Sequence, residues 1–179
     1  MTIERIVLIG GPGTGKTTLI NALAARGYNV FEEISRQVIK AAQNEGIDQL
    51  FLTDPLLFSQ KLLEGRVNQF NAAVENTKNL VLYDRGIPDV LAYMDYAGQN
   101  YPQVFVEACK NHQYDQVFML PPWEEIHEVD NERYEDFSIA KALHDFLVKT
   151  YTYYGYTPII VPLCSVAKRI DFIETQLKR

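Results

Sequence analysis

The sequence of 179 residues predicts an α/β fold built on a parallel β-sheet. Short apolar segments rich in β-formers alternate with longer segments of helical periodicity, which is typical of βαβ units. Most of the short segments are continuously apolar, as in strands that helices cover on both faces. Hydrophobic residues make up 47% and charged residues 22%, so we expect one globular domain over residues 1–179 rather than a disordered or fibrous chain.

The predicted strands are five short apolar segments, at residues 6–9, 28–31, 80–83, 116–120 and 158–161. Helices are predicted at residues 16–26, 34–44, 54–77, 88–96, 103–111, 138–154 and 165–177. Gly27 and Gly46 stand just past the first two helices, where glycine commonly ends a helix. Asp54 followed by Pro55 is a cap and first-turn pair that opens the longest helix. Residues 121–137 are rich in charge and lack clean periodicity, so we expect a short lid there.

The charge and the cysteine content of the sequence argue against several classes of function and partner. The formal net charge is −6 and there is no block of consecutive basic residues, which argues against a nucleic-acid partner. Cys109 and Cys164 stand in separate segments without the spacing of a zinc or redox motif, so we expect a reducing compartment, the cytoplasm. No apolar run reaches the ~18 residues of a membrane span. Small phosphorylated ligands remain compatible with this charge.

Residues 10–17 read GGPGTGKT and fit the P-loop pattern, directly after a predicted strand and before a predicted helix. The backbone amides of such a loop curl around phosphate oxygens, while Lys16 gives its charge to the β- and γ-phosphates and Thr17 ligates Mg²⁺. We therefore expect ATP or GTP together with Mg²⁺. A plain glycine-rich turn is the alternative, and it would match every fixed position only by chance. The predicted nucleotide-binding residues are Gly11, Pro12, Gly13, Thr14, Gly15, Lys16, Thr17 and Thr18.

A dinucleotide-binding fingerprint fits this loop less well. Counted from Gly11 and Gly13, that fingerprint requires a third glycine where the chain has Lys16. A nicotinamide or flavin site is therefore disfavoured.

Asp84 directly follows the predicted strand 80–83. An acidic residue at that place holds Mg²⁺ beside the P-loop, directly or through water. This role requires the strand to lie beside strand 6–9, so we expect the sheet order 2-3-1-4-5 of nucleotide kinases. A cap in the strand-to-helix turn is the alternative role for Asp84.

Arg85 and Asp89 follow at the same carboxyl end of the sheet, where open α/β folds bind ligands. Arg85 could reach a phosphate or an acceptor molecule. The two residues are also four apart, so they could equally pair across one helical turn, a contact of about 0.2–0.5 kcal/mol when exposed. The sequence leaves both interpretations open.

Taken together, these motifs resemble the AAA-type predicted ATPases related to the ribosylnicotinamide kinase domain of the bacterial bifunctional NAD-salvage regulator. The resemblance spans nearly the whole chain and implies a P-loop NTPase three-layer sandwich. Besides the P-loop, it is carried by Glu33-x-x-Arg36, by Asp84-Arg85-Gly86-x-x-Asp89-x-x-Ala92-Tyr93, and by Pro122-Trp123 leading to Asp130-x-x-Arg133. The chain departs from the kinase after Pro-Trp, where it reads Glu124-Glu125-Ile126-His127, and this leaves the acceptor unidentified.

The resemblance implies roles for side chains outside the P-loop. Glu33 would face the acceptor and take its hydroxyl proton or a hydrogen bond, with Arg36 orienting or neutralising it; an ordinary helix start is the alternative for Glu33. Arg133 would be the lid arginine that stabilises charge on the transferring phosphoryl group. Trp123 would either stack on a ring or anchor the lid. The implied catalytic set is Lys16, Asp84, Arg133 and Glu33, and the implied substrate set is Glu33, Arg36, Arg85, Asp89 and Trp123.

The leading functional prediction is a phosphotransferase, a kinase that moves the γ-phosphoryl group of a nucleoside triphosphate to a nucleoside-like hydroxyl acceptor. The rival is a nucleotide-dependent ATPase or GTPase switch or trafficking protein, because the resemblance extends to eukaryotic members that bind GTP and lipid. An AAA-type ring motor is disfavoured, since 179 residues leave no room for its separate helical domain. The sequence lacks the guanine motif Asn-Lys-x-Asp, which favours ATP without excluding GTP.

Overall fold

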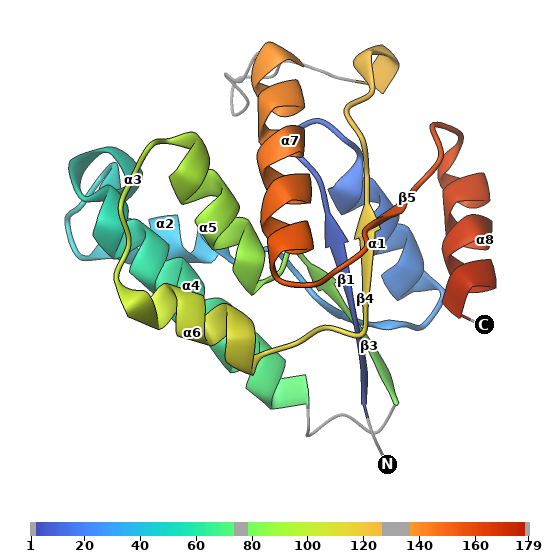
Figure 1. The fold of residues 1–179 in the computed structure, drawn as a ribbon, viewed down its shortest axis with the longest axis horizontal. Coiled ribbons are helices and arrows are strands. Elements are labelled where there is room, and N and C mark those ends of the chain that lie inside the picture. Colours follow the sequence, from blue (N-terminus) through green and yellow to red (C-terminus); the bar gives the residue numbers. More distant parts are fainter. Residues whose placement is uncertain (1–2, 74–78, 127–136, 178–179) are drawn as a thin grey trace.

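The computed structural model of the protein describes residues 3–73, 79–126 and 137–177. Strands of these residues form one parallel sheet with the order β2-β3-β1-β4-β5 (Figure 1). The α/β class and the order 2-3-1-4-5 are therefore as the sequence predicts. The strand bounds are β1 (Glu4–Ile9), β2 (Asn29–Phe31), β3 (Leu80–Asp84), β4 (Gln116–Met119) and β5 (Ile159–Ile160).

The helices of the described residues follow the predicted pattern with a few differences. Their bounds are α1 (Lys16–Ala25), α2 (Ser35–Asn44), α3 (Leu50–Thr53), α4 (Pro55–Ala72), α5 (Ile87–Tyr96), α6 (Gln103–Asn111), α7 (Phe137–Tyr153) and α8 (Val166–Leu177). The single turn α3 was not predicted, because four residues are too few to show a helical period. Helix α4 ends at Ala72 rather than at about Thr77, and residues 74–78 lie outside the described residues.

The predicted lid at 121–137 lies only partly within the described residues. Glu124–Ile126 form a short 3-10 helix, and Phe137 already begins α7. Residues 127–136, and with them the predicted lid arginine Arg133, fall outside the described part of the chain. The lid and the role of Arg133 remain predictions.

Helix ends confirm the capping signals in the sequence. The Asp54 carboxylate accepts a hydrogen bond from the Leu57 amide at 3.0 Å, and Pro55 occupies the first turn of α4, where its missing amide costs nothing. Gly27 follows α1 with a φ of 90°, a left-handed conformation that a side chain would strain. These local signals fix where the helices start and stop.

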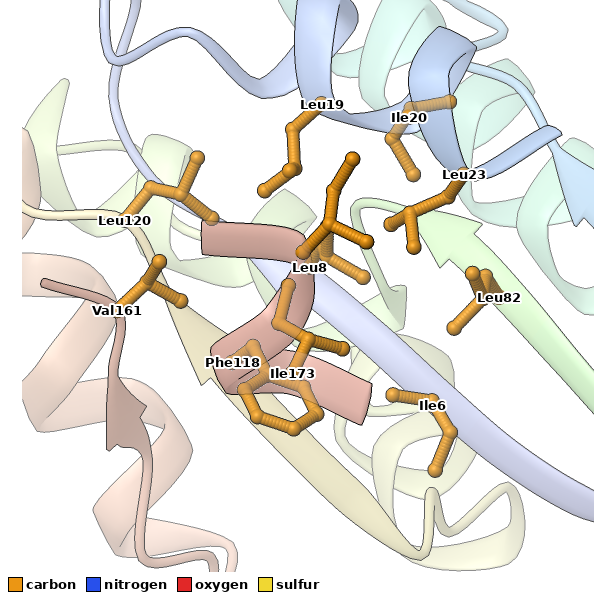
Figure 2. Packing of buried hydrophobic residues seen from close by; sticks show 11 residues of the cluster. Ile6, Leu8, Leu19, Ile20, Leu23, Leu82, Phe118, Leu120, Val161 and Ile173 are labelled. Carbon is orange, nitrogen blue, oxygen red and sulfur yellow. The ribbon is translucent and has the colours of Figure 1, made fainter. Parts of the chain in front are cut away.

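Two apolar layers cover the two faces of the sheet. The first contains Ile6 and Leu8 of β1 and joins them to α1 and α8 (Figure 2). The second contains the alternate residues Val7 and Ile9 and joins them to α5 and α7, with Tyr151 of α7 among its buried members. Alternation along β1 thus sends successive side chains into opposite layers. The result is the expected three-layer sandwich.

Leu8 lies in the centre of the first layer, so truncating it should destabilise the whole domain (Figure 2). Its side chain is fully buried, and we expect Leu8→Ala to lower the free energy of unfolding by about 2–5 kcal/mol because a cavity remains. The matched control is Leu52→Ala, since Leu52 is 64% exposed on α3. Urea unfolding of both variants measures the difference, and equal losses would contradict this account of the core.

Candidate functional site

The P-loop connects β1 to α1 at the carboxyl edge of the sheet. Thr14 closes the loop internally, because its hydroxyl donates to the Gly11 carbonyl at 2.9 Å. The loop also packs tightly on the end of β4: a Cβ on Gly10 would lie 2.6 Å from the Leu120 carbonyl oxygen. Position 10 therefore requires glycine, because any side chain there would clash with Leu120. The loop leads directly into α1, so its backbone amides lie at the start of that helix.

Lys16 lies across this loop rather than out in solvent. Its Nζ donates to the carbonyls of Gly10 and Gly11 at 2.7 and 2.8 Å, and only 7% of the residue is exposed. Burial, together with the charge of Arg85, lowers the pKa of Lys16 to about 7. An ammonium group that donates to carbonyls at the start of a helix can turn to an anionic ligand instead.

Asp84 ends β3 beside the P-loop strand, with Leu8 of β1 as its partner in the register. It is 6% exposed, and its Oδ1 has no hydrogen-bond partner among the described residues. Burial raises the pKa of Asp84 even though Lys16 and Arg85 stand near it. The cap of α5 is formed by Gly86 and Asp89 instead, so the structure does not use Asp84 as that cap.

The oxygen atoms of Asp84 and Thr17 fit a magnesium ion. Both residues line the same cavity, and carboxylate and hydroxyl oxygens are ligands that Mg²⁺ accepts. Among the residues described, no group of three or more His, Cys, Asp or Glu side chains could hold a metal unaided. Mg²⁺ typically binds through one or two protein ligands plus substrate phosphates. When bound there, the ion would neutralise charge on the phosphates.

Glu33 is held by two arginines at the end of β2. Arg85 Nε lies 2.5 Å from its Oε2, and Arg66 Nη2 of α4 lies 3.2 Å from its Oε1. Burial alone would raise the pKa of Glu33, but the guanidinium groups of Arg66 and Arg85 outweigh it and hold that pKa below its ordinary value. Glu33 Oε1 also accepts from the Ser35 amide at 3.1 Å. Glu33 is therefore not an ordinary solvated residue at a helix start, because it lies two residues before α2 and pairs with two arginines. Its role toward an acceptor stays a prediction.

Asp89 completes this cluster from α5 and is almost fully buried. Its carboxylate accepts hydrogen bonds from the Tyr151 hydroxyl at 2.6 Å and from the Gly86 amide at 2.9 Å. Arg85 Nη1 lies 3.6 Å from Asp89 Oδ1, so the predicted pairing across one turn is present. Arg85 also has a φ of 72°, which is unusual for a residue with a side chain and marks local strain.

Two cavities open on this cluster. The phosphate cavity has a volume of about 480 Å³ and is lined by residues 12–18, Glu33, Asp84, Arg85, Trp123, Ile126, residues 164–166 and Arg169. The side pocket, of about 260 Å³, lies among α3, α4 and α5. Of the residues that the structure describes, Glu33 and Arg85 alone line both cavities. The two spaces thus meet at one carboxylate–guanidinium pair.

The structure brings most of the predicted site residues together. The loop residues 12–18 line the phosphate cavity with Asp84, Glu33, Arg85 and Trp123, while Asp89 lines the side pocket. Gly11 lines neither, since its Cα faces the backbone of Ala140 in α7. Arg36 is exposed on α2 and is also absent from both linings.

Three side chains of the site were not predicted from the sequence. Arg66 pairs with Glu33, Tyr151 binds Asp89, and Arg169 lines the phosphate cavity from α8. Each comes from a helix far along the chain, and no local motif surrounds it. A polar residue within the apolar face of a predicted helix was the only available signal.

The sheet order, the loop and the acidic end of β3 define a P-loop nucleotide-binding protein with the architecture of nucleoside and nucleotide kinases. The sequence matches the family described as AAA domain over residues 5–169, so the chain belongs to that family. No curated protein sequence matches it.

Solved structures with the same fold share little sequence with this chain. Deoxyadenosine kinase from M. mycoides, with the products dCMP and dCDP, is 16% identical over 97% of this chain and 98% of its own, with a TM-score of 0.72. NadR protein in complex with NR is 18% identical over 97% of this chain and 51% of its own, with a TM-score of 0.77. Thymidylate kinase from Ehrlichia chaffeensis is 16% identical over 98% of this chain and 100% of its own, with a TM-score of 0.62.

In the part of the chain that the structure covers, no helix is long and apolar enough to span a membrane.

Replacing Lys16 by methionine should weaken nucleotide binding while the fold survives. A hydrogen bond to a charged group contributes about 1.5–3 kcal/mol, so we expect the dissociation constant to rise roughly tenfold to a hundredfold. Calorimetric titration with a nonhydrolysable nucleotide measures it. Lys110→Met is the matched control, because Lys110 is exposed on α6. Unchanged nucleotide binding by Lys16→Met would contradict the assignment of residues 10–17 as a nucleotide-binding P-loop.

Asp84→Asn should separate metal use from nucleotide binding. A neutral amide holds Mg²⁺ less well than a carboxylate does, so the Mg²⁺ concentration for half-maximal turnover should rise severalfold. Nucleotide affinity without Mg²⁺ should change little. Turnover measured across a Mg²⁺ series tests both parts, and a normal metal response would reassign Asp84 to a structural role.

Proposed function

We propose that this protein is a small-molecule kinase that transfers the γ-phosphoryl group of a nucleoside triphosphate to a hydroxyl of a nucleoside-like acceptor. The observation that carries the proposal is the meeting of the phosphate cavity and the side pocket at Glu33 and Arg85. A phosphoryl donor and an acceptor require two adjoining spaces with charged groups at their junction. A nucleotide switch needs the first space alone.

The phosphate cavity supplies the donor side. Its loop amides and Lys16 would bind the β- and γ-phosphates, and Thr17 and Asp84 would hold Mg²⁺. The γ-phosphate would then point toward Glu33 and Arg85, where the cavity joins the side pocket. Positioning and electrostatic stabilisation are the main contributions that a protein makes to this reaction.

The side pocket suits a neutral molecule with a flat ring. Phe58, Tyr93 and Met94 are among its apolar lining residues, and Gln99 adds a polar group. Its two lining arginines, Arg66 and Arg85, already face Glu33 and Asp89. Because these four charges sum to zero, the described part of the pocket offers little net attraction to an acceptor that already carries a phosphate. This supports a nucleoside over a nucleotide as acceptor.

Glu33 would act on the acceptor hydroxyl. Its lowered pKa keeps it ionised at neutral pH, so it can accept a hydrogen bond from the hydroxyl and orient the oxygen in line with the γ-phosphorus. The new O–P bond forms as the bond to the β–γ bridging oxygen breaks, and the hydroxyl proton passes to Glu33 or to the product phosphate. Arg85 would stabilise the charge on the transferring group.

The solved kinases of the same fold support the proposal by analogy of fold. We infer a cytoplasmic location from the cysteines, since Cys109 and Cys164 are both free thiols.

The test is a panel of nucleosides, ribosylpyridines and their monophosphates, incubated with ATP or GTP, Mg²⁺ and the protein, and scored for phosphorylated product. We expect product from at least one uncharged acceptor. Glu33→Gln should reduce its formation about a hundredfold or more while nucleotide still binds. Glu107→Gln, on an exposed residue of α6, is the matched control. Nucleotide hydrolysis without transfer to any acceptor would favour the switch function instead.

A further inference from the structure

Arg169 is a buried arginine of the phosphate cavity whose hydrogen-bonding groups are only partly used. It comes from the first turns of α8 and is 2% exposed. Its Nη1 donates to the Thr14 carbonyl of the P-loop at 3.1 Å, and its guanidinium carbon lies 4.8 Å from the centre of the Trp123 ring. Its Nε and Nη2 are buried and have no hydrogen-bond partner among the described residues.

The position of Arg169 in the cavity indicates which part of a nucleotide it meets. Glu33 and Arg85 mark the end of the cavity that joins the side pocket, and the γ-phosphate would lie at that end. The loop residues bind the phosphates in between. The remaining wall is formed by Trp123, residues 164–166 and Arg169, so the nucleobase would lie there.

The free atoms of Arg169 form one particular hydrogen-bonding group. In a planar guanidinium, the N–H of Nε and one N–H of Nη2 point the same way, side by side, as a two-donor fork. Nη1, the third nitrogen, is already bound to the P-loop. Buried donors without partners are destabilising, so a ligand with two neighbouring acceptors would satisfy both N–H groups at once.

Guanine presents such a pair of acceptors, O6 and N7, on one edge, and arginine binds it through two hydrogen bonds. Adenine presents an acceptor, N7, beside a donor amino group at the same edge, so it satisfies only one of the two N–H groups. We propose that Arg169 reads the base of the donor nucleotide through its Nε–Nη2 fork and selects GTP over ATP. This inference rests on the proposed function only in placing a nucleoside triphosphate on the P-loop.

Nε and Nη2 of the fork are buried, so a base that binds them must move neighbouring groups. A Cβ on Gly15 would lie 3.2 Å from both Arg169 Nη1 and Ile126 Cδ1, so the 3-10 helix Glu124–Ile126 and this guanidinium lie beside the same part of the loop. Trp123 directly precedes that helix and faces the guanidinium. A base that binds the fork would therefore lie beside Trp123, the only tryptophan in the chain, and should change its fluorescence.

The experiment compares the dissociation constants of four nucleotides with Mg²⁺ by calorimetric titration, without any acceptor. ITP keeps O6 and N7 but lacks the guanine amino group, whereas 7-deaza-GTP keeps O6 and loses N7. We expect GTP and ITP to bind alike and about tenfold or more tighter than 7-deaza-GTP and ATP, since one good bidentate pair discriminates by this order. Tryptophan fluorescence in the same titrations should change with GTP.

Arg169→Lys keeps the charge but removes the fork, so the GTP and ATP dissociation constants should come within about twofold of each other. Thermal unfolding of this variant checks its fold. Arg26→Met is the control, because Arg26 is exposed at the end of α1 and pairs with Glu174. This variant should still bind GTP more tightly than ATP.

Equal or tighter binding of ATP by the wild type, or a folded Arg169→Lys that still prefers GTP, would overturn the assignment. The result is independent of phosphoryl transfer. Base selection without any phosphorylated product would defeat the kinase proposal alone, and product formation with equal affinities would defeat the Arg169 proposal alone.

Discussion

The ion pairs between Glu33 and the two arginines Arg66 and Arg85 are the interaction on which the site depends. Charged groups that are taken out of water must be paired, because an uncompensated buried charge is strongly destabilising. Here each partner comes from a different segment: the end of β2, helix α4 and the turn after β3. Satisfying the charges therefore fixes these segments relative to one another. The same pairing places the boundary between the phosphate cavity and the side pocket.

The sequence predicted the phosphate half of this arrangement because its signals are local. A P-loop is one continuous run of residues between a strand and a helix, and its register locates Lys16 and Thr17 without knowledge of the rest. The sheet order followed from a single requirement, that Asp84 stand beside the P-loop strand, and the register Leu8↔Asp84 satisfies it. The cap Asp54–Pro55 likewise needs only its own neighbours.

The other half could not be predicted because its contacts join distant parts of the chain. The resemblance placed Arg36, three residues from Glu33, in the substrate set, but Arg36 lines neither cavity. Arg66, one of the two arginines that pair with Glu33, is 33 residues away from it. No local motif marks Arg66 or Arg169 as buried, and a polar residue within an apolar helix face is too weak a signal to separate them from solvent-exposed arginines. Arg85 shows a further limit: pairing with Asp89 and reaching a phosphate or acceptor were weighed as alternatives. The pair is present, and Arg85 also lines both cavities, so the pairing does not decide between the two roles.

Helix α7 contacts both halves of the site, and this links their movements. Near its start, the backbone of Ala140 lies against Gly11 of the P-loop, and near its end Tyr151 donates to Asp89. At 1.5 Å per residue these two contacts are about 16 Å apart on one rigid rod. Any tilt or slide of α7 must therefore disturb the surroundings of Gly11 and of Asp89 in the same movement. A ligand in either cavity that moves α7 would therefore also act on the other cavity, and by thermodynamic reciprocity each ligand would alter the affinity of the other by the same factor.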